Sequence, residues 1–325
     1  MQKAGPVLWL FFIFFTFVKS GLAEPALSYT TEIKSPLANG AIVVDVRQEQ
    51  SCLQGSLAGA RCLPAADFFG PHGRLINTAE LSWLLGTAGL SGGEHVLVVG
   101  NSPLKRDFVA GILFLAGQQK LSILTVPFLE LTKNSTALTP GQKRLNTRSA
   151  VHSQPFRSKL IILRTELSAL TKGKQIIDLL DGRSEKEYWG ESIRIFRGGH
   201  LPGAQHLPAA ELRTKLRNNS TLVTNYNSPI VYGHNTLESV AYFSLLRAGF
   251  GVDARVFLAG WADWAVHTDL AVDSLTYPDN NVLQKVKTQQ TKSQNNNNFL
   301  PAFIVIIGGL LLLGWGIYTK YGKRS

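Results

Sequence analysis

The chain is poor in sulfur: its 325 residues include two cysteines, Cys52 and Cys62, and a single methionine. Two thiols are too few for a disulfide-dense scaffold or for a zinc site built from four thiolates. Charged residues make up 17% of the chain and apolar residues 45%, a composition that excludes collagen-like and wholly disordered proteins. Basic residues outnumber acidic ones by 33 to 22, a net charge of +11. The length predicts about two domains.

The amino-terminal segment has the pattern of an export signal. Lys3 precedes an uncharged apolar run over residues 6–18. As a helix this run would reach only about 20 Å, which is too short to cross a bilayer core. Gly21 and Ala23 then supply the small residues of a cleavage site, so residues 1–23 are predicted to be a signal peptide. An uncleaved signal anchor is the alternative.

The carboxyl-terminal segment has the pattern of a membrane anchor. Residues 299–318 are uncharged and would span about 30 Å as a helix, with Trp315 and Tyr318 near one end. The basic tail that follows, residues 319–325, is predicted to lie in the cytoplasm by the positive-inside rule. A polar stalk over residues 276–298 precedes the span. We therefore expect a single-pass protein, held by the lipid bilayer, with most of the chain in the periplasm or another extracytoplasmic compartment.

Between these ends, the same order of strands and helices occurs twice. Short β-branched runs predict strands, and stripes of apolar residues at helical spacing predict helices, the first of them with Thr78 as its N-cap. Their alternation predicts α/β domains, each with a parallel sheet covered by helices on both faces. The predicted strands are 41–47, 59–64, 95–99 and 121–126, then 175–181, 204–208, 229–232 and 254–258; the predicted helices are 78–90, 107–115, 209–217 and 238–248.

A basic segment separates the two halves. Lys133 to Lys174 contain nine Lys or Arg residues and one acidic residue. Residues 133–164 are therefore predicted to be a basic linker, and a solvated connector is the favoured interpretation. The alternative is a patch for anionic lipid headgroups or for an acidic protein partner. We expect no nucleic-acid partner, because no recognition motif is present.

Motifs in both halves carry a family resemblance. The second half has LDGRS at 180–184, GHLPGA at 199–204 and FLAGW at 257–261. The first half repeats two of them more faintly, as VDVR at 44–47 and GSLAGA at 55–60. This arrangement resembles the rhodanese family, and the tandem resembles the two-domain thiosulfate and mercaptopyruvate sulfurtransferases. The resemblance implies two rhodanese-like domains, over residues 28–132 and 165–275.

The resemblance also implies where catalysis would occur. Rhodaneses place a cysteine after the fourth strand, in a loop whose N–H groups face the sulfur, and an arginine five positions later. Here Gly233 and Glu238 occupy these two positions, and Gly100 occupies the cysteine position of the first half. We expect the helix from Glu238 to keep unpaired N–H groups, and Gly233→Cys with Glu238→Arg to restore some transfer. The degenerate loop is Gly233, His234, Asn235, Thr236, Leu237 and Glu238, in which no catalytic residue, metal or cofactor is expected.

Other side chains remain as candidates for binding or chemistry. Arg183, Arg197 and Lys105 are predicted to contact a ligand. Cys52 and Cys62 are interpreted as a disulfide in an oxidising compartment, with buried free thiols and a relocated nucleophile as alternatives.

Two histidines are predicted to have structural roles and not catalytic ones. His234 is interpreted as a local hydrogen-bond partner and not as a nucleophile, and His200 as the structural histidine of the family.

The favoured function is a catalytically silent binding or scaffolding module. The alternatives are a sulfurtransferase that moves sulfur from thiosulfate or mercaptopyruvate to a thiophile, and a structural partner of a membrane complex that uses the basic linker.

Overall fold

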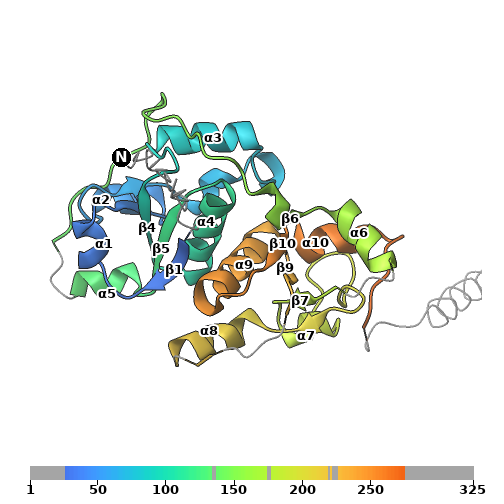
Figure 1. Cartoon of the computed structure of the whole chain (residues 1–325). Helices are drawn as coiled ribbons and strands as arrows, with labels where there is room; N and C mark the ends of the chain where they lie inside the picture. Colours follow the sequence, from blue (N-terminus) through green and yellow to red (C-terminus); the bar gives the residue numbers. More distant parts are fainter. Residues whose placement is uncertain (1–25, 134–136, 174–176, 219, 222–225, 275–325) are drawn as a thin grey trace, which may run out of the picture.

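The structure is a computed structural model, which describes residues 26–133, 137–173, 177–218, 220–221 and 226–274 (Figure 1). The predicted signal peptide, stalk, membrane span and cytoplasmic tail lie outside the described residues. Within those residues, the structure contains no helix with the length and apolar character that a membrane crossing needs. The predicted anchor over residues 299–318 therefore stays a prediction.

The first half forms a five-stranded parallel sheet with the strand order β1-β5-β4-β2-β3. Apolar residues alternate between its faces: Val44 and Val98 pack into one cluster of buried residues, and Val43 and Leu97 into another. Both faces are buried, which explains why its strands are continuously apolar. The elements are β1 (Ala26–Thr30), α1 (Lys34–Ala38), β2 (Ile42–Asp45), α2 (Glu49–Gln54), β3 (Arg61–Cys62), α3 (Thr78–Thr87), β4 (His95–Val99), α4 (Pro103–Leu115), β5 (Lys120–Leu124) and α5 (Phe128–Lys133).

The second half forms another five-stranded parallel sheet, with the matching order β6-β10-β9-β7-β8. The two domains thus share one topology, as the repeated pattern predicts. The elements are β6 (Ile161–Ile162), α6 (Arg164–Lys172), β7 (Leu179–Asp181), α7 (Glu185–Tyr188), β8 (Gln205–His206), α8 (Ala209–Arg217), β9 (Ile230–Tyr232), α9 (Thr236–Phe250), β10 (Arg255–Phe257) and α10 (Gly260–Ala265).

Several helix starts differ from the prediction. The N-cap of α3 is Asn77 and not Thr78, because the Asn77 side chain accepts the N–H of Glu80 while the Glu80 carboxylate accepts the N–H of Asn77. Helix α4 begins at Pro103, four residues early, since proline is favoured in the first turn of a helix. Helix α9 begins at Thr236, ahead of the predicted Glu238.

The described part of the basic linker is hydrogen-bonded to the first domain, while most of its residues are exposed to solvent. Residues 137–157, here called the strap, run along the first domain (Figure 1). Thr139 exchanges backbone hydrogen bonds with Ser56, and the Ser149 and Ala150 N–H groups donate to the carbonyl of Gly86. The strap therefore fills hydrogen bonds that the first domain leaves open. The second domain begins with β6 and α6, so it starts earlier than the predicted residue 165.

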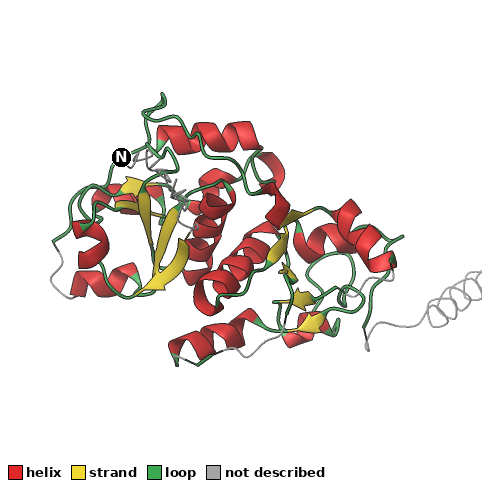
Figure 2. Cartoon of the chain, viewed as in Figure 1, coloured by secondary structure: helices red, strands yellow, loops and turns green. Residues whose placement is uncertain are grey.

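Helices α4 and α9 lie side by side between the two sheets and join the domains (Figure 2). They approach closely at Gly111, where an added Cβ would overlap the Ser244 side chain and come within 2.6 Å of Val240. The ring centroids of Phe114 and Phe243 lie 6.2 Å apart. One cluster of buried apolar residues contains members of both domains, so the two halves share a core.

Candidate functional site

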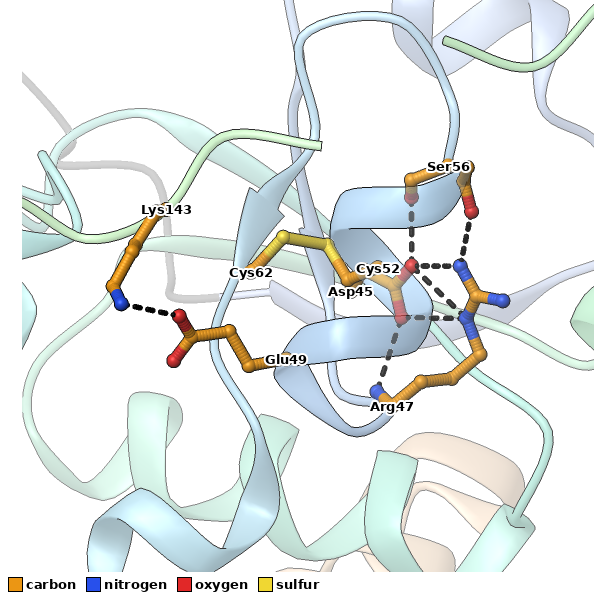
Figure 3. Close-up of a disulfide and its surroundings, with 8 residues drawn as sticks. Asp45, Arg47, Glu49, Cys52, Ser56, Cys62 and Lys143 are labelled. Carbon is orange, nitrogen blue, oxygen red and sulfur yellow. Dashed lines mark hydrogen bonds and ion pairs between the residues drawn. A yellow bond between two sulfur atoms is a disulfide. The ribbon is translucent and has the colours of Figure 1, made fainter. Parts of the chain in front are cut away.

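An aspartate and an arginine fix the loop after the second strand of each domain. Arg183 Nη2 lies 2.6 Å from Asp181 Oδ2, and the same nitrogen donates to the carbonyl of Gly199 at 2.7 Å. In the first domain Arg47 makes the equivalent bonds to Asp45 and to the carbonyl of Gly55, both at 2.6 Å (Figure 3). These pairs hold the loops of both domains in the same way.

The three predicted binding residues are not gathered at one site. The Arg183 side chain is 1% exposed and bonded to Asp181. Arg197 is buried and donates to the carbonyls of Ala265 and His267. Lys105 is exposed in the first turn of α4, on the other domain. Arg183 and Arg197 thus make structural hydrogen bonds inside the protein, and their predicted binding role stays a prediction.

The degenerate loop lies between β9 and α9 and is pressed against two helices. The N–H groups of Trp261 and Ala262, in α10, donate to the carbonyls of Gly233 at 2.9 Å and His234 at 2.7 Å. A Cβ added to Gly233 would lie 2.7 Å from the carbonyl carbon of Glu238 and 2.9 Å from the backbone nitrogen of Ser239. Because these contacts are to helix backbone, the loop leaves no room for a cysteine at residue 233.

Side chains of the protein accept hydrogen bonds from three of the N–H groups of this loop. The Glu238 N–H donates to Asn235 Oδ1 at 3.0 Å, so this one of the helix N–H groups expected to be unpaired has a partner: Asn235 caps the helix. The Gly233 N–H donates to Ser239 Oγ at 3.0 Å, and the His234 N–H to Glu238 Oε2 at 3.2 Å. A carboxylate of the chain itself thus accepts one of the N–H groups of the loop.

Arg194 completes this arrangement as a cation between two glutamates. Its guanidinium lies 2.7 Å from Glu238 Oε1 and 3.1 Å from Glu187 Oε1. The hydrogen bond to Glu238 raises the pKa of Arg194. For Glu187, burial acts to raise the pKa, but hydrogen bonds from Ser184 and Arg194 outweigh it and the pKa is lowered. Sequence reasoning did not predict the contacts of Arg194 with Glu187 and Glu238, because a contact between distant segments leaves no local pattern.

His234 is buried beside Glu187 in this cluster. Burial, and then the positive charge of Arg194, lower the pKa of His234. Its Nδ1 lies 3.6 Å from Glu187 Oε1 and makes no hydrogen bond within the described residues. A proton added to His234 would therefore be held less well in the folded protein than in the unfolded chain.

We expect acid to destabilise the protein partly through His234. Where the folded pKa lies below the unfolded value of about 6.5, the unfolded chain binds more protons, and stability falls as the pH falls through that window. The thermal midpoint should drop between about pH 7 and pH 5, and His234→Gln should reduce this drop. His72→Asn, at an exposed histidine, is the control and should leave the drop unchanged. An equal drop of the thermal midpoint in all three proteins would contradict the role assigned to His234.

The corresponding loop of the first domain is closed in a similar way. It joins β4 to α4 through Gly100, where an added Cβ would lie 2.8 Å from Val46 Cγ2. Arg106 is buried and donates to the carbonyl of Gly100 at 2.6 Å and to that of Thr125 at 3.0 Å. This loop too has glycine in the cysteine position and is held by internal bonds.

The two cysteines are not part of either loop. Cys52 in α2 and Cys62 in β3 form a disulfide with their Cα atoms 5.7 Å apart (Figure 3). Both are buried, and they are the only cysteines of the chain. In the disulfide state no thiol is left to attack a sulfur donor.

Comparison with known proteins identifies the second domain. Residues 163–267 match the model of the rhodanese-like domain. A protein of Synechococcus elongatus assigned as a thiosulfate sulfurtransferase is 27% identical over 173 residues, which are 51% of this chain and 52% of that protein. The chain thus spans about half the length of the curated relative it matches. It carries a rhodanese-like domain and is homologous to a protein of thiosulfate sulfurtransferase type.

Solved structures extend the likeness to both domains. A crystal structure assigned as a thiosulfate sulfurtransferase is 25% identical, with a TM-score of 0.50, and the match covers 72% of this chain and 97% of that one. Wild-type EanB is 17% identical, with a TM-score of 0.58, and the match covers 74% of this chain and 67% of that one. At this identity EanB supports the fold alone. The two parallel sheets are consistent with two rhodanese-like domains.

Proposed function

We propose that this chain is a catalytically silent member of the rhodanese fold, exported and anchored in a membrane, which acts as a binding or scaffolding module. The observation that carries the proposal is the closed loop at Gly233. The N–H groups of Gly233 and His234 are bonded to Ser239 and Glu238, and the backbone of α9 leaves no space for a side chain at residue 233. Such a loop holds neither a persulfide nor the anion that would form one.

Electrostatics support the same conclusion. Glu238 has a carboxylate where the family has an arginine, and it already accepts Arg194 at 2.7 Å. A thiosulfate dianion entering the loop would have to displace this ion pair and would meet a negative charge at close range. Repulsion of this kind at 4 Å is worth about 4 kcal/mol near a protein surface.

Export is supported by the disulfide. Bonds such as Cys52–Cys62 persist in oxidising compartments and are rare in the cytosol. This agrees with the signal peptide predicted over residues 1–23 and with the anchor predicted over residues 299–318. A partner would then be a protein of the exported compartment or of the membrane.

The family itself favours the second candidate, an active sulfurtransferase. Its support is the likeness to proteins assigned as thiosulfate sulfurtransferases. For this chain it would require sulfur to be carried on Cys52 or Cys62 after their disulfide has been reduced. Both lie in the first domain and are buried, which disfavours the transfer.

A turnover assay separates the two candidates. The full chain, purified in detergent, would be supplied with thiosulfate and cyanide, and separately with mercaptopyruvate and a thiol acceptor. We expect no transfer above the rate without protein, with and without prior reduction. Turnover that disappears in a Cys52→Ser, Cys62→Ser double variant would favour the sulfurtransferase, and turnover that survives in it would place a different nucleophile in the chain.

A further inference from the structure

A small pocket lies between the strap and the first domain, away from both loops. Its volume is about 270 Å³, which is less than the roughly 300–1,000 Å³ typical of sites for drug-sized ligands. It is lined by three basic residues and no acidic one, together with hydroxyl and amide side chains; the polar lining residues are Arg61, Lys143, Arg144, Thr87, Ser149 and Gln142. The pocket therefore offers donors to an anion.

The strap holds the basic side chains in place. The Gln142 N–H donates to the carbonyl of Ala60 at 2.7 Å, and the Cys62 N–H to the carbonyl of Gln142 at 2.9 Å. Gly141 packs on the disulfide so tightly that an added Cβ would lie 2.5 Å from Cys52 Sγ and 2.7 Å from Cys62 Sγ. The disulfide and these hydrogen bonds thus hold the strap wall of the pocket against the wall formed by the first domain.

Arg61 is the cation that lacks a counter-charge. Lys143 lies 2.9 Å from Glu49 (Figure 3), and Arg144 lies 2.8 Å from Asp67. Within the described residues Arg61 has no carboxylate partner: one of its terminal nitrogens bonds the Gln142 side chain, and its buried Nε has no hydrogen-bond acceptor. An anion would supply the missing negative charge.

A second, larger cavity lacks this excess of basic side chains. It measures about 1130 Å³ and is lined by residues of α4, α8 and the ends of β1 and β5. Its charged lining residues are three basic and three acidic, namely Arg106, Arg213, Arg217, Glu32, Asp107 and Glu130. Because the signs balance, this cavity selects no charge class of ligand.

We propose that the pocket under the strap binds a small divalent oxyanion, of the class of sulfate, thiosulfate or phosphate. Arg61 provides the main charge-assisted contact, and Lys143 and Arg144 add positive charge. This site is separate from the loop at Gly233 and does not depend on whether the protein transfers sulfur.

Isothermal titration calorimetry on the full chain in detergent tests the site. Sodium sulfate, thiosulfate and phosphate would be compared with sodium chloride at equal ionic strength. At least one oxyanion should bind while chloride does not. Arg61→Met should weaken that binding about tenfold or more, since it removes a charge-assisted contact. Lys143→Gln should weaken it about threefold, because its side chain is mostly exposed.

Lys159→Gln is the matched control, since Lys159 is an exposed lysine that does not line the pocket. It should leave the affinity unchanged. If Arg61→Met does not fold by circular dichroism, Lys143→Gln decides. Binding no better than that of chloride, or equal in all variants, would overturn the proposal. Tighter binding of glycerol 3-phosphate than of every inorganic anion would also overturn it, in favour of a lipid headgroup.

Discussion

Replacing Arg183 by methionine should lower the free energy of unfolding by about 3–5 kcal/mol. The change leaves the Asp181 carboxylate buried without its cation, because both side chains are at most 1% exposed. It also removes the bond to the carbonyl of Gly199, which closes the loop after β7. Chemical denaturation of the full chain in detergent, followed by circular dichroism, measures the loss.

Two further variants make this result specific. Arg47→Met removes the equivalent cation of the first domain and should cost less, because the Arg47 side chain is 14% exposed and water can reach the vacated site. Asp181→Leu combined with Arg183→Met should recover part of the loss, since no charge is then left buried alone. A loss below about 1 kcal/mol for Arg183→Met would contradict the role given to the pair.

Gly233→Cys should destabilise the second domain by about 1–3 kcal/mol and give no sulfur transfer. The new Cβ would come within 2.9 Å of the Glu238 and Ser239 backbone, so the start of α9 must move. Thermal unfolding and the thiosulfate assay would be run on the same preparation. Gly93→Cys is the matched control, because a Cβ there meets nothing within 4 Å; it should leave the midpoint unchanged.

For a second change, Glu238→Arg, the structure leads to a different prediction from the one drawn from the sequence, which was that it would help. In the structure Glu238 accepts Arg194 at 2.7 Å and the N–H of His234. An arginine at residue 238 would lose both bonds and place two cations together. We expect the double variant to be less stable than Gly233→Cys and equally inactive, and measurable turnover in it would contradict the closed loop.

The fold follows from the sequence to a large extent, because strongly apolar strands and amphipathic helices mark their own positions. Strands β2 and β4 and helix α8 lie where the pattern places them. The edge strands β1 and β6 were missed: β1 is half exposed, and β6 has only two residues inside a basic segment. The order of the strap was missed as well, since its hydrogen bonds go to distant backbone groups.

The candidate site was predictable in identity but not in geometry. The motif spacing identifies Gly233 and Glu238 as the altered positions, because the spacing of that loop is local in sequence. The sequence does not reveal that Asn235 caps α9 or that Arg194 reaches Glu238 from 44 residues away. The first depends on a loop conformation and the second on tertiary packing.

Mass spectrometry of the intact wild-type chain after incubation with thiosulfate is the most direct test of a silent loop. With Gly233 closed against α9 and both cysteines in a disulfide, we predict a mass unchanged by thiosulfate, before and after mild reduction. A gain in mass of one sulfur atom, located by peptide mapping, would show a persulfide on this chain and contradict the account.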